Sequence, residues 1–304
     1  MRIDELLARQ RPVFSIEFFP PKTEEGERQL YETIEALQPL EPDYVSVTYG
    51  AGGTNRDGTV EAAERIKSEY GIEVMAHLSC VGETQAGLAE ILKRFESIGI
   101  ENVLALRGDP PRGETKFTPP PDGLSSAAEL TEFITARHDF TIGGACFPEV
   151  HPEAESLEAD LTYLKSKVDA GAKFLITQLF FDNRVYFDFV AAARERGIDV
   201  PIIPGVIPIQ SYGQVVRICK LCDASIPPEL DAAMSSLGGD EEAERLLGVA
   251  YAARQCEELL AAGAPGVHFY ALNRAPGTRA VLAALRASKP WERAEPGALD
   301  RAAA

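Results

Sequence analysis

Polar side chains end several otherwise apolar segments of this chain, and their types could carry out acid–base chemistry. They are Glu17, Thr48, His77, Arg107, Asp109, Gln178 and Tyr270. Glu17 stands out because it lies in FSIEFFPP, among phenylalanines. Desolvation there would raise the pKa of the carboxyl, so we expect a protonated Glu17 that serves as a general acid at neutral pH. A glutamate held by a salt bridge at the rim of the fold is the alternative.

Asp109 is the second carboxylate that could take part in chemistry. It follows Arg107 and Gly108 and precedes two prolines, which hold the backbone in a non-helical course. Arg107 could neutralise Asp109 as a structural pair, or leave it available. Glycines at positions 50, 52 and 53 follow another strand-like segment, where backbone N–H groups could approach a phosphate or a flat ring.

Missing motifs narrow the chemistry further. The sequence contains no G-x-G-x-x-G after a strand, no G-x-x-x-x-G-K-[ST] and no G-x-S-x-G. The histidines, at 77, 138, 151 and 268, are too far apart for metal-ligand spacing, so we predict no metal site. Cys219 and Cys222 lie in an apolar helical pattern and are interpreted as core residues rather than a redox or metal pair.

Short strand-like segments must position these side chains. They cover residues 14–18, 44–48, 74–78, 102–106, 141–146, 174–179, 201–207 and 267–272, and amphipathic helical patterns separate them. Such alternation predicts βαβ units and a parallel sheet. An α/β fold of the (β/α)8 TIM-barrel type is favoured over a doubly wound open sheet, because the polar strand ends would then meet in one ring.

The same pattern predicts a single barrel domain over 1–288 and a loosely ordered tail over 289–304, with Trp291 as a packing residue. The proline-rich segment 110–124 cannot be a helix, and is interpreted as a lid or as a solvated loop. The long interval 208–266 should hold two or more helices.

Composition excludes some partners. The 304 residues include 30 Lys+Arg and 47 Asp+Glu, a net charge of −17, which argues against nucleic acid or anionic membranes as partners. No apolar run approaches the roughly 18 residues of a membrane helix, and the start MRIDELLARQ has no signal-peptide core. The 5 cysteines are scattered and odd in number, so we expect buried thiols in a cytoplasmic protein.

Seven motifs together resemble the methylenetetrahydrofolate reductase family: FSIEFFPPKT, VSVTYGAGG, ALRGDPP, FPEVHPEA, KVDAGAKFLITQLFFD, IIPGVIPI and HFYALNRA. They run in order from about residue 12 to 285 and cover the catalytic barrel of the short bacterial form. The resemblance implies a (β/α)8 barrel that holds FAD. It also implies reduction of 5,10-methylenetetrahydrofolate to 5-methyltetrahydrofolate by NADH or NADPH, in one-carbon and methionine metabolism.

The resemblance assigns roles to individual positions. Glu17 matches the acid that helps to open the folate ring, and Asp109 matches an aspartate near flavin and pterin. Gln178, Tyr270 and Arg274 match substrate-binding residues, the arginine facing the glutamate tail; Tyr212 stands where a phenylalanine stacks on nicotinamide. The positions matched to FAD contacts are Thr48, His77, Arg107, Gly108, Asp109, Ala127, Phe147, His151, Ala154, Asp160 and Lys167.

Three of the cofactor positions depart from the bacterial pattern. Phe147 stands where a tyrosine is usual, Tyr163 replaces an asparagine, and Ser126 replaces an aromatic residue. The implied mechanism is ping-pong, with nicotinamide and folate using one flavin face in turn, which would explain the missing dinucleotide fingerprint. A homo-oligomer is expected. A different FAD-dependent barrel, such as a proline-dehydrogenase-like enzyme, and a non-catalytic folate or flavin binder are the alternatives.

Overall fold

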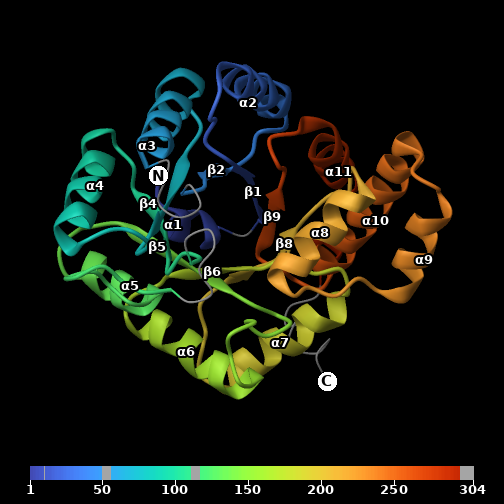
Figure 1. Cartoon of the computed structure of the whole chain (residues 1–304). Coiled ribbons are helices and arrows are strands. Elements are labelled where there is room, and N and C mark those ends of the chain that lie inside the picture. Colours follow the sequence, from blue (N-terminus) through green and yellow to red (C-terminus); the bar gives the residue numbers. More distant parts are fainter. Residues whose placement is uncertain (10, 50–55, 111–116, 295–304) are drawn as a thin grey trace.

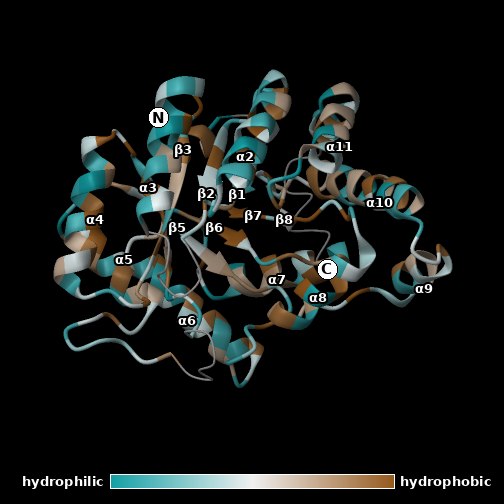
Figure 2. Cartoon of the chain, turned by 45° about the horizontal axis from the view of Figure 1, so that its top comes forward, coloured by the Kyte–Doolittle hydropathy of each residue, from teal (hydrophilic) through white to brown (hydrophobic). Residues whose placement is uncertain are grey.

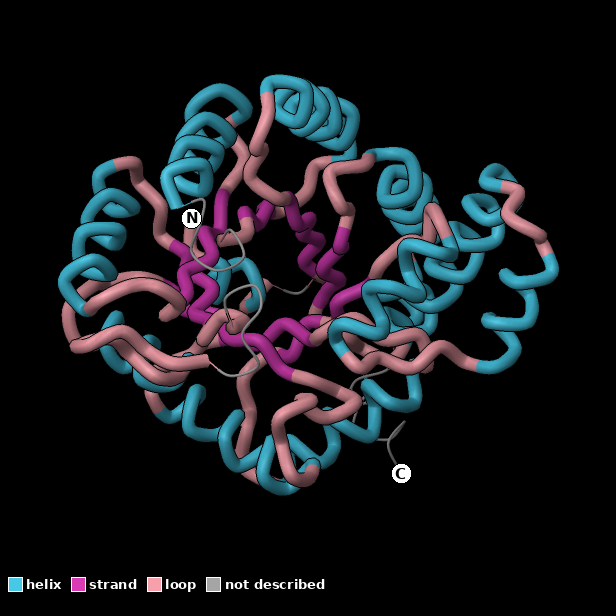
Figure 3. Tube along the Cα trace, viewed as in Figure 1, coloured by secondary structure: helices cyan, strands magenta, loops and turns pink. Residues whose placement is uncertain are grey.

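A ring of parallel strands surrounded by helices forms the protein (Figures 1 and 3). The computed structural model describes residues 1–9, 11–49, 56–110 and 117–294. The strands are β1 (Val13–Phe18), β2 (Tyr44–Val47), β3 (Val74–Ser79), β4 (Asn102–Leu106), β5 (Thr141–Cys146), β6 (Phe174–Thr177), β7 (Ile202–Ile203), β8 (Gly205–Val206) and β9 (Gly266–Tyr270). They follow the order β7-β6-β5-β4-β3-β2-β1-β9-β8.

The seventh position of the barrel is divided between β7 and β8. β7 pairs with β6, and β8 pairs with β9, so the two short pieces complete the ring. Pro204 lies between them and has no N–H to donate to a ladder. The predicted (β/α)8 barrel is therefore confirmed, and the open-sheet alternative is wrong.

Most of the helices cover the outside of the ring, as the cyan segments of Figure 3 show. The helices of the described residues are α1 (Ile3–Leu7), α2 (Glu24–Leu37), α3 (Arg56–Arg65), α4 (Gln85–Ser97), α5 (Ala127–Thr135), α6 (Leu157–Asp169), α7 (Asn183–Glu195), α8 (Tyr212–Cys222), α9 (Pro228–Ser236), α10 (Glu241–Ala261) and α11 (Ala275–Ser288). Short turns of helix are η1 (Gln38–Leu40), η3 (Ile66–Tyr70) and η4 (Pro290–Arg293).

Side-chain caps fix where many of these helices begin. The capping oxygens, which accept N–H bonds from the first turn, belong to Thr23, Thr84, Ser126, Ser156, Asp182 and Asp240. Such a cap typically contributes about 1 kcal/mol. Since most of these caps immediately follow a βα loop, they also fix where the loops of the barrel rim end.

Alternation along the strands divides the core into two parts. On β1, Phe14, Ile16 and Phe18 point outward into the main apolar core under the helices, while Ser15 and Glu17 point into the barrel. Figure 2 shows brown segments along the strands and mixed brown and teal on the outer helices, as amphipathic helices require. Inward-facing polar residues are thus placed where the barrel can use them.

The short helix α1 lies below the amino ends of the strands. Ile3 and Leu6 are buried there with Tyr44, Met75 and Phe174 in a second apolar cluster. The backbone N–H of Ile3 donates to the side-chain oxygen of Asn102 at 2.9 Å. This plug closes the floor of the barrel, and the charged start of the sequence did not predict it.

The interval 208–266 contains three helices, α8, α9 and α10, as the length of the gap indicated. In Figure 1, α8 lies beside β8, α10 lies beside α11, and α9 lies farthest from the ring. In the described part of the tail, Pro290 is buried and the ring of Trp291 packs on Phe14 with centroids 5.7 Å apart, so Trp291 is a packing residue. The loose order of the tail stays a prediction. Residues 295–304 lie outside the described residues.

No helix among the described residues is long and apolar enough to cross a membrane.

The two cysteines of α8 provide a test of the core interpretation. Cys219 is buried in an apolar cluster, and burial raises the pKa of its thiol to about 12, so no thiolate is available at neutral pH. Replacing Cys219 and Cys222 together by alanine should lower the free energy of unfolding by about 1 kcal/mol per site. Enzymatic turnover should not change. Turnover of the unmodified protein that responds to reductant or metal, and loses that response in the double variant, would contradict this interpretation.

Candidate functional site

Glu17 lies at the centre of a buried polar cluster inside the barrel. Its Oε2 atom is 3.4 Å from Nε2 of His268 on β9 and 3.5 Å from Nε2 of His77 on β3. The register of the sheet brings these side chains close together, because Glu17 pairs with Ser46 on β2 and with Tyr270 on β9. The cluster thus joins four neighbouring strands around one carboxylate.

The acid–base state of Glu17 differs from the expectation drawn from the sequence. Burial raises its pKa, but the hydrogen bond with His268 and the nearby imidazoles act in the opposite direction and prevail, so the pKa lies below its ordinary value. The predicted protonated resting carboxyl is therefore wrong. The physical reason is alternation: Phe18 points into the outer core and Phe19 is largely exposed, while the inward neighbours are polar.

His77 is held uncharged at neutral pH. Burial lowers the pKa of its imidazole to about 4, although Glu17 acts to raise it. Its Nε2 atom is buried and has no hydrogen-bond partner, and the same holds for Ser46 Oγ and Tyr44 Oη on β2. Burying a polar atom without a hydrogen-bond partner lowers the stability of the fold. We therefore interpret this side of the barrel interior as serving function rather than packing.

Tyr270 connects this cluster to β6. Its hydroxyl donates to the backbone oxygen of Thr177 at 2.6 Å, and its ring lies edge-on to His268 with centroids 5.2 Å apart. Thr177 is the last residue of β6, so Gln178 follows directly. A continuous set of contacts therefore leads from Glu17 to Gln178.

A cavity of about 570 Å³ opens at the carboxyl ends of β4, β5 and β6, and Gln178 lines it. This volume is typical of small-molecule sites. The other predicted site residues that it brings together are Arg107, Gly108, Asp109, Phe147, His151, Ala154, Asp160 and Lys167. Its remaining walls include Leu106, Ala145, Glu153, Ala159 and Tyr163.

Arg107 is paired with Glu153 rather than with Asp109. Its two terminal nitrogens lie 2.5 Å and 2.8 Å from the two oxygens of Glu153, a bidentate pair that raises the pKa of the guanidinium. Asp109 is exposed at the cavity edge and makes no ion pair with a described residue. The structural Arg107–Asp109 pair is therefore not formed, and Asp109 stays available.

Lys167 is a buried cation in the cavity wall. Its Nζ donates to the backbone oxygen of Ala145 at 2.6 Å, and no carboxylate of the described residues lies within ion-pair distance. Burial lowers the pKa of this ammonium. A desolvated cation with two further N–H donors suits an anionic ligand such as a phosphate.

Tyr163, which departs from the family pattern, braces this wall. Its ring lies 5.1 Å from Lys167 Nζ, and its hydroxyl accepts the backbone N–H of Ala127 at 3.1 Å. Ala127 itself is buried at the start of α5 and does not line the cavity. The backbone N–H of Ala127 is thus bonded to the Tyr163 hydroxyl, and the predicted contact of Ala127 with a cofactor stays a prediction.

The loop after β5 shapes the adjoining wall. Asp160 accepts the backbone N–H of His151 at 2.9 Å, and the ring of Phe147 lies edge-on to His151 with centroids 4.5 Å apart. Burial and the neighbouring Arg107 lower the pKa of His151. Nδ1 of His151 accepts the N–H of Glu153 at 3.0 Å, so a neutral ring carries its proton on Nε2.

Gly108 fits the turn that ends β4 for a specific steric reason. Its φ is +87°, and an added Cβ would lie 2.5 Å from Ser79 Oγ and 2.8 Å from a methyl of Val81. A side chain would both strain the backbone and collide with β3. The glycine thus lets the chain turn tightly between Arg107 and Asp109.

Three other predicted residues lie elsewhere. Thr48 is buried after β2, and its backbone oxygen accepts the hydroxyl of Thr59 at 2.9 Å. Tyr212 begins α8, and its hydroxyl donates to Asp231 of α9, so the structure does not bring it into the cavity. Arg274 is exposed at the start of α11 and makes no ion pair within the described part of the chain.

Two predicted features fall partly or wholly outside the described residues. The glycines at 50, 52 and 53 belong to the undescribed range 50–55. Residues 111–116 of the proline-rich segment are undescribed as well, and its described residues 117–124 form no helix. Whether the segment is a lid stays a prediction. Among the described residues, no group of three or more His, Cys, Asp or Glu side chains is arranged to hold a metal.

Sequence reasoning missed four residues that build the site: Ser15, Glu153, His268 and Asn273. The Asn273 side chain accepts the N–H of Phe19 at 2.8 Å and donates to its oxygen at 2.9 Å, which ties the loops after β1 and β9 together. His268 had a usable signal, because it lies two residues before Tyr270 and therefore on the same face of β9. No sequence signal identified Glu153, because its pairing with Arg107 joins two separate loops.

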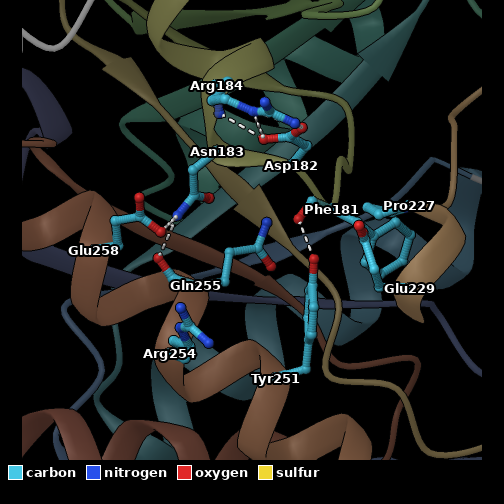
Figure 4. A pocket seen from close by; sticks show the side chains of 10 residues that line it. All are labelled: Phe181, Asp182, Asn183, Arg184, Pro227, Glu229, Tyr251, Arg254, Gln255 and Glu258. Atoms are coloured by element: carbon cyan, nitrogen blue, oxygen red, sulfur yellow. Dashed lines mark hydrogen bonds and ion pairs between the residues drawn. The ribbon is translucent and has the colours of Figure 1, made fainter. Parts of the chain in front are cut away.

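A second cavity, of about 330 Å³, lies between the start of α7 and α10 (Figure 4). Several of its polar groups pair with one another, while Oδ1 of Asn183 is buried without a hydrogen-bond partner. Arg184 pairs with Asp182, the Asn183 amide donates to Glu258 at 2.9 Å, and the Tyr251 hydroxyl donates to a backbone oxygen at 2.7 Å. These bonds fasten α10 to the loop after β6, which is a structural role.

Comparison with known proteins agrees with the geometry. The family model for methylenetetrahydrofolate reductase matches residues 2–286. A 5,10-methylenetetrahydrofolate reductase of Escherichia coli is 40% identical over 267 residues, covering 88% of each chain. A probable methylenetetrahydrofolate reductase (NADH) of Oryza sativa is 39% identical over 292 residues, covering 92% of this chain and 49% of the relative. The chain spans about half the length of the plant relatives that it matches.

Solved structures support the fold independently. A Clostridium thermocellum protein described as binding two copies of 5-methyl-5,6,7,8-tetrahydrofolic acid superposes with a TM-score of 0.64 at 17% identity, covering 94% of this chain and 98% of its own. At that identity the likeness concerns the barrel fold alone. Because the family model matches nearly the whole chain and a relative is 40% identical, this chain belongs to the methylenetetrahydrofolate reductase family.

Proposed function

We propose that this protein reduces 5,10-methylenetetrahydrofolate to 5-methyltetrahydrofolate with NADH or NADPH as electron donor and FAD as bound cofactor. The observation that carries the proposal is the cavity of about 570 Å³, which brings Arg107, Asp109, Lys167 and Gln178 together and connects through Tyr270 to Glu17. Family membership argues against a proline-dehydrogenase-like barrel. The proposal places the enzyme in the one-carbon metabolism that supplies methionine, as a cytoplasmic homo-oligomer.

The chemistry of the cavity residues fits FAD. Lys167 offers a buried cation without a carboxylate partner, and Arg107 offers a second cation at the rim. Tyr163 and Phe147 offer ring surfaces, and Gly108 lets the backbone turn tightly beneath the cavity. When bound, FAD would accept hydride from the nicotinamide and pass hydride to the folate carbon, the two substrates using one flavin face in turn.

Residues outside the cavity fit the folate side. Arg274 is exposed on the rim beyond β9 and could attract the carboxylates of a glutamate tail. Tyr270 and Gln178 lie at the ends of β9 and β6, which flank the divided position of β7 and β8, and both could contact a pterin there. Asp109 is exposed at the cavity edge, and we assign it a place near both flavin and pterin from the family resemblance.

Glu17 supplies the acid that opening of the five-membered folate ring needs. The ring opens when a nitrogen gains a proton, and Oε2 of Glu17 is the atom that would deliver it. In the ligand-free chain this oxygen faces two imidazoles, and the Glu17 pKa is below its usual range. Transfer therefore requires that a proton first reach Oε2.

Spectroscopy and one assay test the proposal. The purified protein should show flavin absorbance, or gain it when FAD is added, and should form methyltetrahydrofolate with NADH or NADPH. Measuring both donors decides between them. A protein that shows no flavin bands even after FAD is added would contradict the redox function, and one that binds flavin without turnover would support the non-catalytic alternative.

Lys167 provides a test of the cofactor site. Lys167→Met should weaken FAD binding by roughly 10-fold to 100-fold, since a hydrogen bond to a charged group is worth about 1.5–3 kcal/mol. Lys165→Met is the matched control on the same helix, because Lys165 is paired with Asp169 outside the cavity. Titration of the apoprotein with FAD measures both. Equal weakening in the two variants would contradict a phosphate-binding role for Lys167.

Arg274 provides a test of the folate side. Arg274→Ala should raise the KM for folate several-fold, because a protein of net charge −17 needs a local cation to accept folate carboxylates. Reduction of the flavin by the nicotinamide should change little. Arg279→Ala, an exposed arginine further along α11, is the control. If both half-reactions suffer equally in Arg274→Ala, the arginine is structural.

Glu17→Gln tests the acid. The amide keeps the shape and can donate a hydrogen bond, but it cannot deliver a proton, so folate reduction should slow by at least roughly 10², the lower bound for general acid catalysis. Reduction of the flavin by the nicotinamide needs no acid at this position and should be nearly unchanged. Stopped-flow absorbance follows the two half-reactions separately. Equal slowing of both would mean that Glu17 positions the cofactor or stabilises the rim.

A further inference from the structure

The turn between β9 and α11 connects two residues of the proposed folate site. Tyr270 ends β9, and Arg274 immediately precedes α11. The N–H of Arg274 donates to the backbone oxygen of Ala271 at 2.9 Å, which closes the turn. Its two central residues, Leu272 and Asn273, have φ values of +52° and +54°. Positive φ at both central positions is characteristic of a type I′ turn.

This backbone conformation is unfavourable for most residues. Glycine, asparagine and aspartate dominate type I′ turns, because a left-handed φ brings the Cβ of other residues too close to the backbone. Leu272 is therefore strained, and such a residue keeps its conformation only where surrounding contacts hold it. Asn273 tolerates the conformation, but a glycine would suit it at least as well. The turn alone therefore does not explain why residue 273 carries a side chain.

The Asn273 side chain takes the place of a partner strand for the chain that leaves β1. Its oxygen accepts the backbone N–H of Phe19 at 2.8 Å, and its nitrogen donates to the backbone oxygen of Phe19 at 2.9 Å. We call these two bonds the Asn273 clamp. The ladder between β1 and β9 ends with the pair of Glu17 and Tyr270, so the clamp continues the connection past the point where the strands separate.

Helix α2 holds the same residue through its backbone. The Thr33 hydroxyl donates to the backbone oxygen of Asn273 at 3.1 Å, and the Gln29 amide donates to it at 3.4 Å. Thr33 is itself buried, and α2 packs beside α11 (Figure 1). On the other side, β1 lies between β2 and β9 in the sheet. The unit of β1 and α2 is therefore the anchor, and the strained turn is the part that it holds.

We propose that Asn273 is a positioning residue that fixes where Arg274 starts on the rim, so that one folate molecule reaches Arg274 with its carboxylate tail while its pterin lies near Glu17. This inference rests on the proposed function. Arg274 is exposed and its side chain makes no cap bond to α11, so the backbone of the turn decides where the guanidinium can reach. Without the clamp, folate binding would first have to order the turn, which costs binding free energy.

The clamp acts on the tail end of the site rather than on the acid. Glu17 lies within the sheet and pairs with β2 on one side and β9 on the other, so its position does not depend on Asn273. Arg274 lies beyond the sheet and directly follows two left-handed residues. Loss of the clamp should therefore weaken binding of the tail, while proton transfer from Glu17 and reduction of the flavin should stay unchanged.

Asn273→Gly removes the clamp and keeps a residue that suits a positive φ. The KM for 5,10-methylenetetrahydrofolate should rise by roughly 3-fold to 10-fold, the factor that ordering one long side chain contributes to binding. The maximal rate of folate reduction should change little. In the Arg274→Ala background the same substitution should raise the KM no further, because a residue that acts through another has no effect once the other is gone. Thr33→Val leaves the turn sequence intact and should raise the KM by less.

A substrate without the tail separates positioning from a general loss of structure. With 5,10-methylenetetrahydropteroate, which lacks the glutamate, Asn273→Gly and the unmodified protein should have the same KM. The control is Glu41→Gly, which replaces another exposed residue of positive φ, at +50°, before β2 at the amino ends of the strands. It should leave the KM for both substrates unchanged. A KM that rises equally for both substrates in Asn273→Gly, or for neither, overturns the proposal.

Hydrogen exchange tests the clamp without any substrate. The amide proton of Phe19 should exchange faster in Asn273→Gly than in the unmodified protein, while that of Thr48, which donates to the backbone oxygen of Phe18, should not. Equal exchange of Phe19 in the two proteins overturns the clamp even if folate is reduced. An unmodified protein that reduces no folate contradicts the proposed function, and with it the role of Arg274. One that reduces folate, with an unchanged KM in Asn273→Gly, overturns this inference alone.

Discussion

The buried carboxylate of Glu17 sets the conditions that the rest of the barrel must meet. A charge at this depth is costly unless groups on neighbouring strands face it. His77 and His268 do so from β3 and β9, and they can only because the parallel register places their side chains at the level of Glu17. The fold therefore has to place β1 between β9 and β2, with β3 next in order.

This requirement divides the barrel interior into two unequal halves. Around β1 the inward side chains are polar, and several buried atoms there lack partners. Across the ring the interior is apolar, with Phe174 lying so close to Gly143 that an added Cβ would come within 2.6 Å of its ring. The apolar half and the plug formed by α1 carry the packing of the interior. That division frees the polar half for chemistry.

The features that the sequence could predict are those set by residues close together in the chain, and the features it could not predict depend on contacts between distant strands and loops. Strand positions, the (β/α)8 barrel and the convergence of Arg107, Asp109 and Gln178 follow from periodicity, because strand ends in a barrel must converge on one rim. The other predicted residues around the larger cavity came from the family resemblance. The acid–base state of Glu17 did not follow, since the phenylalanines beside it in the chain point outward and the imidazoles that face it come from β3 and β9. The same limit hid Glu153, whose pairing with Arg107 joins two loops.

Charge placement explains how an acidic protein can still suit anionic ligands. A net charge of −17 repels anions, but salt screens exposed charges beyond about 8 Å under physiological conditions, so nearby groups dominate. Glu153 already neutralises Arg107, whereas Lys167 within the cavity and Arg274 at the rim have no carboxylate partner among the described residues. Under the proposed function, the acidic residues of the surface would thus not decide binding. These two cations would, Lys167 toward a phosphate and Arg274 toward a carboxylate tail.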